Sequence, residues 1–302
     1  MKYEDLSFDD LGTRRQRPMF LSTFTQFRSG MSMRTYPHDP HAYTKYFLDE
    51  IDTWIHEHKW IQYRGLDNFP IREAIHGTTH TLDELHYLHK GKICVFDGEY
   101  KYHERLLGWK LKKIKTADQI SFGDVLVVSY PSCITANYLP NFAEVLDHCY
   151  KMNVPVHIDG AWFGQCRNFY FNVNHPAIQS VSVSLSKALG MGSNRIGIRY
   201  SREKVQGPIS IMNDYNYCNV SDMWIGVAMM KYYGPDYWWK NYSEQYTKVC
   251  EDFGLEECNS IHLGKVGNTH YGIRTPLRML IEGKYDIRGT DRGLNEVERN
   301  EK

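Results

Sequence analysis

Two charged side chains stand in stretches of the sequence that are otherwise apolar or small. Asp159 ends the apolar stretch VPVHID, and the small residues Gly160 and Ala161 follow it, leaving room for something flat against the backbone. Lys187 lies inside SVSVSLSKALG, an apolar and hydroxyl-rich stretch that we expect to be buried. A buried amine has a depressed pKa and can act as a nucleophile toward carbonyl groups. Lys187 is therefore a candidate for Schiff-base chemistry.

A third charge, Arg195, follows Lys187 by eight residues, beyond the glycine-rich ALGMGSN. Such a loop can fold back so that the lysine, serine hydroxyls and a guanidinium surround one anion. The functional interpretation is a Schiff base beside a phosphate site. The alternatives are structural: Asp159 could cap a helix or pair with an arginine, and Lys187 could be a solvated surface charge.

Composition narrows the classes of partner. The 302 residues carry 36 basic and 36 acidic side chains, so no net charge attracts nucleic acid, and a small-molecule or protein partner is favoured. Seven cysteines without C-x-x-C spacing argue against a disulfide framework or a thiolate zinc site. The acidic start and the lack of an apolar run of about 18 residues predict neither a signal peptide nor a membrane span. We expect a cytoplasmic protein.

Short apolar stretches alternate with helical patterns and must position these charges. The stretches are KICVF (92–96), DVLVVSY (124–130), VPVHID (154–159), SVSVSL (180–185) and RIGIRY (195–200). Between the second and the third, Phe142, Val145, Leu146 and Cys149 share one helical face. Strands buried on both faces and separated by helices predict an α/β fold with a mainly parallel sheet. Ligands of such sheets sit beyond the carboxyl ends of the strands, where Asp159 lies.

The pattern divides the chain into three parts. Residues 1–70 are expected to form an N-terminal arm and an amphipathic helix, and residues 71–215 the large α/β domain. Residues 216–302 are expected to form a helical segment interrupted at Gly234 and Pro235, a reduced C-terminal domain with a few strands, and a charged, frayed tail.

The segments HIDGAWFG and SLSKALGMGSNRIG resemble the fold type I pyridoxal-phosphate enzymes, the aspartate aminotransferase superfamily. In that family an Asp-x-Ala segment holds the pyridine nitrogen of pyridoxal 5'-phosphate (PLP), a Ser-x-x-Lys segment carries the aldimine lysine, and an arginine eight residues later binds the phosphate. Asp159–Ala161, Ser184–Lys187 and Arg195 match these positions. The resemblance, which extends more loosely over 77–200, implies a PLP-binding large domain with helices on both faces of the sheet and a shortened C-terminal small domain.

The same resemblance implies further cofactor-binding residues. The family binds phosphate with a Gly/Ser/Thr turn at a helix N-terminus, where free amides and the helix dipole favour an anion. HGTTHTLDEL supplies such a turn, although it could be a helix start with threonine caps. In the family, an aromatic residue after the next strand stacks on the cofactor ring. Tyr100 is the candidate here, although it could instead be a core or surface residue. The predicted phosphate set is Gly77, Thr78, Thr79, Ser184, Ser186 and Arg195.

Two positions depart from the family pattern. The family places an asparagine against the cofactor's phenolic oxygen in the loop that here reads PSCITAN, where Ser132 or Asn137 could substitute. Trp162 stands where a tyrosine is expected after Asp-x-Ala, and its indole nitrogen can donate a hydrogen bond but cannot accept one.

Substrate and metal binding rest on fewer residues. An arginine of the family's small domain grips the substrate carboxylate, because its planar fork matches a carboxylate. Arg274 is the candidate and Arg278 the reserve, and either could be a surface or ion-pair residue.

No metal is predicted, since no carboxylate or thiolate at ligand spacing accompanies the histidines. These are His80, His86, His89 and His157.

The resemblance implies an aminotransferase that moves an amino group between an amino acid and a 2-oxo acid through a Lys187 aldimine. Lys187 and Asp159 are the predicted catalytic residues, and a homodimer is implied. A PLP-dependent amino-acid decarboxylase or lyase is an alternative, since His157-x-Asp159 also resembles decarboxylases, although their lysine follows a histidine and here Ser186 precedes Lys187. The third hypothesis is a non-catalytic protein that retains the fold.

Overall fold

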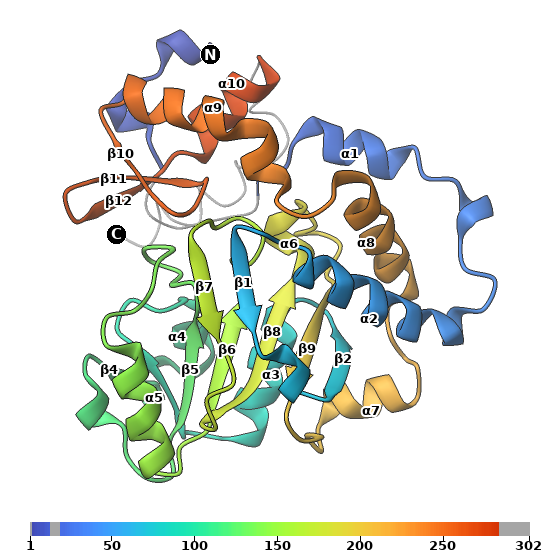
Figure 1. The fold of residues 1–302 in the computed structure, drawn as a ribbon, viewed down its shortest axis with the longest axis vertical. Helices are drawn as coiled ribbons and strands as arrows, with labels where there is room; N and C mark the ends of the chain where they lie inside the picture. Colours follow the sequence, from blue (N-terminus) through green and yellow to red (C-terminus); the bar gives the residue numbers. More distant parts are fainter. Residues whose placement is uncertain (1, 13–18, 284–302) are drawn as a thin grey trace.

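A computed structural model describes residues 2–12 and 19–283 of the chain (Figure 1). The predicted charged tail lies outside the described residues. The largest sheet has seven strands in the order β2-β9-β8-β6-β5-β3-β4. Their bounds are β2 Ile71–Ile75, β3 Ile93–Phe96, β4 Lys112–Ile114, β5 Val125–Ser129, β6 Val156–Gly160, β8 Ile178–Ser184 and β9 Gly197–Ser201.

The sheet is mainly parallel, as predicted. Strands β4, β3, β5, β6 and β8 pair in parallel, and only β9 runs against its neighbours β8 and β2. The five apolar stretches of the sequence become β3, β5, β6, β8 and β9. Every residue of β5, β6 and β9 is buried, which is why these strands show no alternation of polar and apolar residues. The carboxyl ends of β2, β3, β5, β6 and β8 therefore share one edge.

Helices cover both faces of the sheet. Val125 and Val127 of β5 pack with Leu82 and Leu85 of α3, whereas the alternate residue Leu126 belongs to the larger core cluster. Figure 1 shows α3 behind the sheet and α2 in front of it. The helices of this part are α2 Pro40–His56, α3 Thr78–Leu88, α4 Tyr102–Leu107, α5 Phe142–Lys151, α6 Leu185–Ala188 and α7 Pro208–Asp214.

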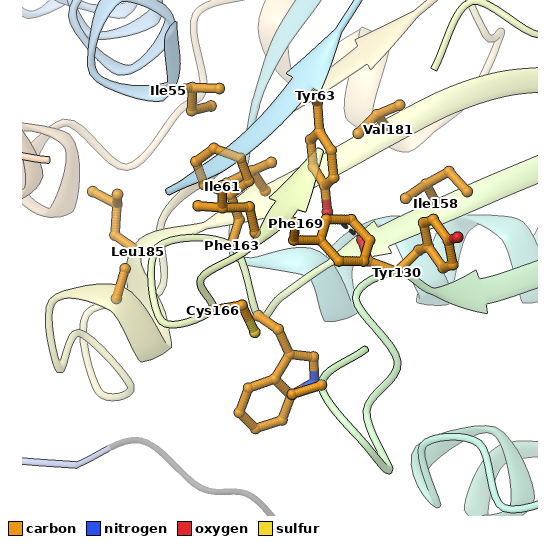
Figure 2. Close-up of a cluster of buried hydrophobic side chains, with 14 of the residues drawn as sticks. Ile55, Ile61, Tyr63, Tyr130, Ile158, Phe163, Cys166, Phe169, Val181 and Leu185 are labelled. Atoms are coloured by element: carbon orange, nitrogen blue, oxygen red, sulfur yellow. Dashed lines mark hydrogen bonds between the residues drawn. The ribbon is translucent and has the colours of Figure 1, made fainter. Parts of the chain in front are cut away.

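The N-terminal segment adds a second layer over the loop that follows β6. After α1 (Ser22–Ser29) and α2, strand β1 (Ile61–Arg64) pairs in parallel with β7 (Phe169–Asn172). Figure 2 shows Ile61 and Tyr63 of β1 gathered with Phe163 and Phe169, and the Tyr63 hydroxyl donates a hydrogen bond to the carbonyl of Tyr130. Chain segments more than a hundred residues apart thus share one core.

The C-terminal part lies beyond the carboxyl ends of the sheet strands (Figure 1). The predicted interruption at Gly234 and Pro235 separates α8 (Val220–Tyr233) from α9 (Tyr237–Asp252). The few strands expected here are an antiparallel sheet of β10 (Glu256–Glu257), β11 (Leu263–Val266) and β12 (Thr269–Gly272), followed by α10 (Arg274–Glu282). None of the helices in the described ranges is long and apolar enough to cross a membrane.

Candidate active site

Asp159 lies buried in the middle of the sheet at its carboxyl edge. In the strand register it faces Ser129 of β5 on one side and Ser182 of β8 on the other. Its Oδ1 accepts a hydrogen bond of 2.9 Å from the backbone amide of Ala161. Burial raises the pKa of the Asp159 carboxyl, while the charge of Lys187 and the hydrogen bonds from Ala161 and Thr78 lower it. The anion thus depends on these donors and on a nearby positive charge.

Lys187 sits on the short helix α6, directly after β8. Its Nζ lies 4.4 Å from the centre of the Trp162 ring, over the ring face. Burial lowers the pKa of the Lys187 amine, the negative charge of Asp159 raises it, and Arg195 lowers it. An aromatic face attracts a cation, so Trp162 stabilises the protonated amine. The residue that replaces the expected tyrosine is therefore in contact with the candidate catalytic lysine.

Four residues form what we call the anion pocket: Gly77, Thr79, Ser186 and Arg195. Arg195 Nη1 donates to the Ser186 hydroxyl at 2.6 Å, and Nη2 donates to the Thr79 hydroxyl at 2.8 Å. Gly77 caps α3 with a φ of +71°, and a methyl group there would lie 2.4 Å from Arg195 Nη2. A glycine turn, a helix N-terminus and a guanidinium thus meet at one point, which suits an anion.

Comparison with known proteins supports the fold alone. No known family model and no curated protein sequence matches the chain. Among solved structures, an aspartate aminotransferase from Thermotoga maritima aligns with 91% of this chain and 92% of its own at a TM-score of 0.58 and 12% identity. The PLP-bound C-S lyase from Staphylococcus hominis aligns with a TM-score of 0.57, at 9% identity over 85% of this chain and 86% of its own.

An alanine aminotransferase from Pyrococcus furiosus aligns with a TM-score of 0.54 and 12% identity, over 84% of this chain and 75% of its own. The chain has the fold of the fold type I PLP-dependent enzymes. The resemblance inferred from three short motifs is confirmed at the level of fold. In this fold type I chain, the three motifs lie together at the carboxyl edge of the sheet.

The other predicted phosphate ligands, Thr78 and Ser184, do not bond the Arg195 guanidinium in the structure. The Thr78 hydroxyl bonds Asp159 and not Arg195. Ser184 is buried at the end of β8, in register with Gly197 of β9. Ser186 and Thr79 are therefore the hydroxyls of the predicted set that contact the guanidinium.

Tyr100 follows β3 and lies at the same edge as the other site residues. Its ring stacks on that of Tyr102, with centres 5.8 Å apart and planes 15° apart. Burial raises the pKa of the Tyr100 hydroxyl, the negative charge of Asp159 raises it further, and the charge of Arg195 lowers it. The side chain is 43% exposed, so one part of the ring remains accessible beside these two charges.

In the loop after β5, the two residues predicted to face the cofactor's phenolic oxygen both accept hydrogen bonds from nearby backbone amides. Ser132 Oγ accepts hydrogen bonds from the amides of Ile134 and Thr135, so it stabilises its own turn. Asn137 is exposed, and its Oδ1 accepts from the amide of Tyr138. Cys133 of the same loop lies near enough that a negative charge on its sulfur would raise the pKa of Lys187.

Glu99 joins Cys133 as a site residue that the sequence analysis missed. Glu99 Oε1 accepts a hydrogen bond of 2.8 Å from the Cys133 thiol, and its charge raises the pKa of Asp159. One signal was available, because Glu99 follows the carboxyl end of the predicted strand 92–96 just before Tyr100. Its partner lies 34 residues later in another loop, a distance that local patterns do not span.

Gln165 and His262 lie close to Lys187. Gln165 Nε2 lies 2.7 Å from the Lys187 carbonyl and 3.3 Å from His262 Nε2. Burial lowers the pKa of His262 to about 3, and the charges of Arg274 and Lys187 lower it as well. Arg274, at the start of α10, and Lys187 are thus both near His262. Arg278 pairs with Glu282 at 2.9 Å.

In the described part of the chain, no group of three or more His, Cys, Asp or Glu side chains is arranged so that it could hold a metal ion. His86 Nε2 lies 2.9 Å from His103 Nδ1, and His157 Nδ1 lies 2.7 Å from Ser180 Oγ. His80 stacks on His76 and accepts a hydrogen bond from its amide.

Proposed function

We propose that the protein is a PLP-dependent aminotransferase that moves an amino group between an amino acid and a 2-oxo acid. One observation carries the proposal: Lys187, Asp159 and the anion pocket converge at the carboxyl edge of the seven-stranded sheet. The three groups match the three functional parts of PLP, a carbonyl carbon, a basic ring nitrogen and a phosphate.

The residues present fit the cofactor chemically. A phosphate would replace the internal hydrogen bonds of Arg195 with charge-assisted ones, together with the hydroxyls of Thr79 and Ser186. The lack of a side chain at Gly77 keeps the space beside the guanidinium open. Tyr100 would limit movement of the ring plane from the outer side.

Asp159 and Lys187 would do the proton chemistry. Asp159 would hold a proton on the pyridine nitrogen, and that positive charge would compensate the burial of the carboxylate. When bound, the cofactor supplies an electron sink for the electron pair left at the substrate α-carbon. Lys187, with a pKa lowered by burial, would take a proton from that α-carbon as a general base and deliver it to the cofactor's C4′ carbon as a general acid.

Arg274 is the proposed partner of the substrate carboxylate, supported by its place near His262, whose pKa the charge of Lys187 also lowers. A homodimer belongs to the same proposal, and sedimentation velocity would measure it.

The proposal is tested by incubating the PLP-loaded protein with single amino acids and following the 2-oxo acid formed. Adding a second 2-oxo acid should then produce the matching new amino acid. The Lys187→Ala variant, which keeps the anion pocket, should give neither product. A wild type that binds PLP but transfers no amino group across the standard amino acids would contradict the aminotransferase assignment.

A C–S lyase is the second candidate, because solved C–S lyases align as well as aminotransferases do. It predicts that sulfur-containing amino acids release a thiol, ammonia and a 2-oxo acid without needing a second 2-oxo acid. A decarboxylase would release carbon dioxide in the same assay. A non-catalytic protein of this fold would give no product from any amino acid.

A further inference from the structure

The loop that follows β6 holds the helix α6 at three points. Gly164 of this loop has a φ of +84°, and a methyl group there would lie 2.7 Å from the Cβ of Ala188, so the loop packs closely against α6. Gln165 Nε2 donates a hydrogen bond of 2.7 Å to the carbonyl of Lys187. The ring of Trp162 faces the Lys187 amine, with 4.4 Å between the ring centre and Nζ. One loop therefore fixes Lys187 at its backbone and at the end of its side chain.

Local hydrogen bonds keep Trp162 in this orientation. The amide of Phe163 donates to the carbonyl of Gly160 at 2.9 Å, and the amide of Gln165 donates to the carbonyl of Trp162 at 3.2 Å. The Trp162 side chain is buried and belongs to the main hydrophobic core. A ring that is packed in the core and carried by a hydrogen-bonded turn has little freedom to turn away from the amine.

Four titratable groups on other parts of the fold act on the same amine through charge. Asp159 at the end of β6 favours its protonated form, a negative charge on Cys133 after β5 would do the same, and Arg195 before β9 opposes it. His262, next to β11, is near enough for the charge of Lys187 to lower its pKa. Trp162 differs from these groups, because it offers the amine an uncharged ring face.

We propose that Trp162 is a positioning residue that binds the ammonium form of Lys187 on its ring face and so holds the proton that Lys187 carries during amino-group transfer. The inference rests on the proposed function, in which Lys187 is the proton carrier. The amine becomes an ammonium when it takes the proton from the substrate α-carbon. It becomes an amine again when it delivers that proton to the cofactor's C4′ carbon. An aromatic face attracts the ammonium more than the neutral amine, so the ring stabilises Lys187 between these two steps.

The same role explains the departure from the family pattern at this position. The expected tyrosine has a hydroxyl that can donate and accept hydrogen bonds, whereas the indole of Trp162 has a single N–H donor. Among the aromatic side chains, tryptophan has the face that binds cations best. The tryptophan therefore exchanges a hydrogen-bonding group for a cation-binding face.

The first experiment measures the pKa of the Lys187 amine in the protein without cofactor. Competitive labelling with acetic anhydride over a range of pH, followed by peptide mass spectrometry, measures it for individual lysines. Trp162→Phe keeps a ring face and Trp162→Leu removes it, so the pKa of Lys187 should be lower in Trp162→Leu than in Trp162→Phe by about 0.5 to 1 unit. The exposed Lys45 is the internal reference, and its rate of labelling should be the same in both variants.

The comparison of these two variants isolates the ring face. Both are smaller than tryptophan, so water that enters the freed space acts on the amine in each of them. Trp224→Leu is the control, because it removes a tryptophan that packs on Tyr36 and should leave the pKa of Lys187 unchanged. Circular dichroism shows whether each variant is folded, and Trp162→Met replaces Trp162→Leu if the latter is not. The same pKa of Lys187 in Trp162→Phe and in the variant without a ring would overturn the inference.

The second experiment uses the PLP-loaded protein and an amino acid deuterated at its α-carbon. A less stabilised ammonium makes Lys187 a weaker base, so proton removal should be slower in Trp162→Leu than in Trp162→Phe. We expect kcat to be lower by about threefold to tenfold, KM to differ by less than about twofold, and the deuterium isotope effect on kcat to be larger. A merely structural role of Trp162 would reduce the PLP-loaded fraction and leave the isotope effect unchanged, which would overturn its role in proton transfer.

The outcomes separate the two proposals. A wild type without a Lys187-dependent visible band after incubation with PLP overturns the proposed function and the role of Trp162 in proton transfer. A wild type that has the band, with the same pKa of Lys187 in Trp162→Phe and Trp162→Leu, overturns only the inference about Trp162.

Discussion

Arg195 connects the start of α3 with α6 through Thr79 and Ser186. If the pocket binds the cofactor phosphate, Arg195→Ala removes its charge and two donors. A hydrogen bond to a charged group contributes about 1.5–3 kcal/mol, so the dissociation constant for PLP should rise about tenfold to a hundredfold. Fluorescence titration with PLP measures it. Arg64→Ala, at an exposed arginine of β1, is the control, and an equal loss in both variants would contradict the assignment.

Gly77 offers a separate test of the same pocket. In Gly77→Ala the new methyl group lies 2.4 Å from Arg195 Nη2, and the backbone has a φ of +71°. Gly91→Ala is a matched control, because its φ is +75° and nothing lies within 4 Å of the new methyl group. Both variants should lose about 1–3 kcal/mol of unfolding free energy in urea, and only Gly77→Ala should also lose PLP affinity. Unchanged PLP affinity in Gly77→Ala would place the phosphate elsewhere.

The residues of the site fall into two groups by how far they could be predicted. Asp159, Lys187 and Arg195 belong to short motifs beside strand ends, so local patterns were enough to name them as candidates. Glu99 and Cys133 meet through a contact between two loops, which only the folded sheet brings together.

At the scale of elements, α9 is anchored to the segment between α2 and β1. Asp236, directly before α9, accepts hydrogen bonds of 2.9 Å from His58 Nδ1 and from the backbone amide of Lys59. The side chains of Asp236 and His58 are both buried. Asp236→Asn keeps the shape but turns one acceptor into a donor that faces the Lys59 amide. The free energy of unfolding should fall by about 1–3 kcal/mol.

Urea unfolding at neutral pH measures this effect. The matched control is Asp147→Asn, which changes an aspartate that is paired with His175 but 66% exposed in its side chain. It should leave stability nearly unchanged, because exposed pairs contribute little. Equal losses in both variants would contradict a specific role for the buried pair.

Strand prediction succeeded where burial shows in the sequence and failed where it does not. The strands β3, β5, β6, β8 and β9 are apolar runs and were predicted. The strand β2 was missed because it contains Glu73, a carboxylate that is buried with an ion pair to Arg199 of β9 and a hydrogen bond from Ser210. The pairing of β1 with β7 joins segments more than a hundred residues apart, and no local pattern contains that information.

At the scale of the whole molecule, buried neutral histidines predict acid sensitivity. Burial lowers the pKa of His103, His157 and His262 to about 3. Histidine titrates near 6.5 in an unfolded chain, so below that pH the unfolded state binds more protons. The stability from each histidine is complete above pH 6.5 and falls by about 1.4 kcal/mol per pH unit below it.

Urea unfolding between pH 7.5 and pH 5 should show this loss. In His157→Gln the slope below pH 6.5 should be smaller by about 1.4 kcal/mol per pH unit, because one titrating group is gone. A free energy of unfolding that stays constant from pH 7.5 to pH 5 would contradict the buried neutral state of these histidines.

The most direct measurement of the central claim is the absorbance spectrum of the purified protein after incubation with PLP, followed by borohydride reduction and peptide mass spectrometry. We predict a visible band in the wild type and, after reduction, a pyridoxyl group on Lys187. Lys187→Ala should show no such band, while Arg64→Ala should match the wild type. A wild type without the band, or a pyridoxyl group on another lysine, would contradict the assignment of Lys187 as the cofactor-binding residue.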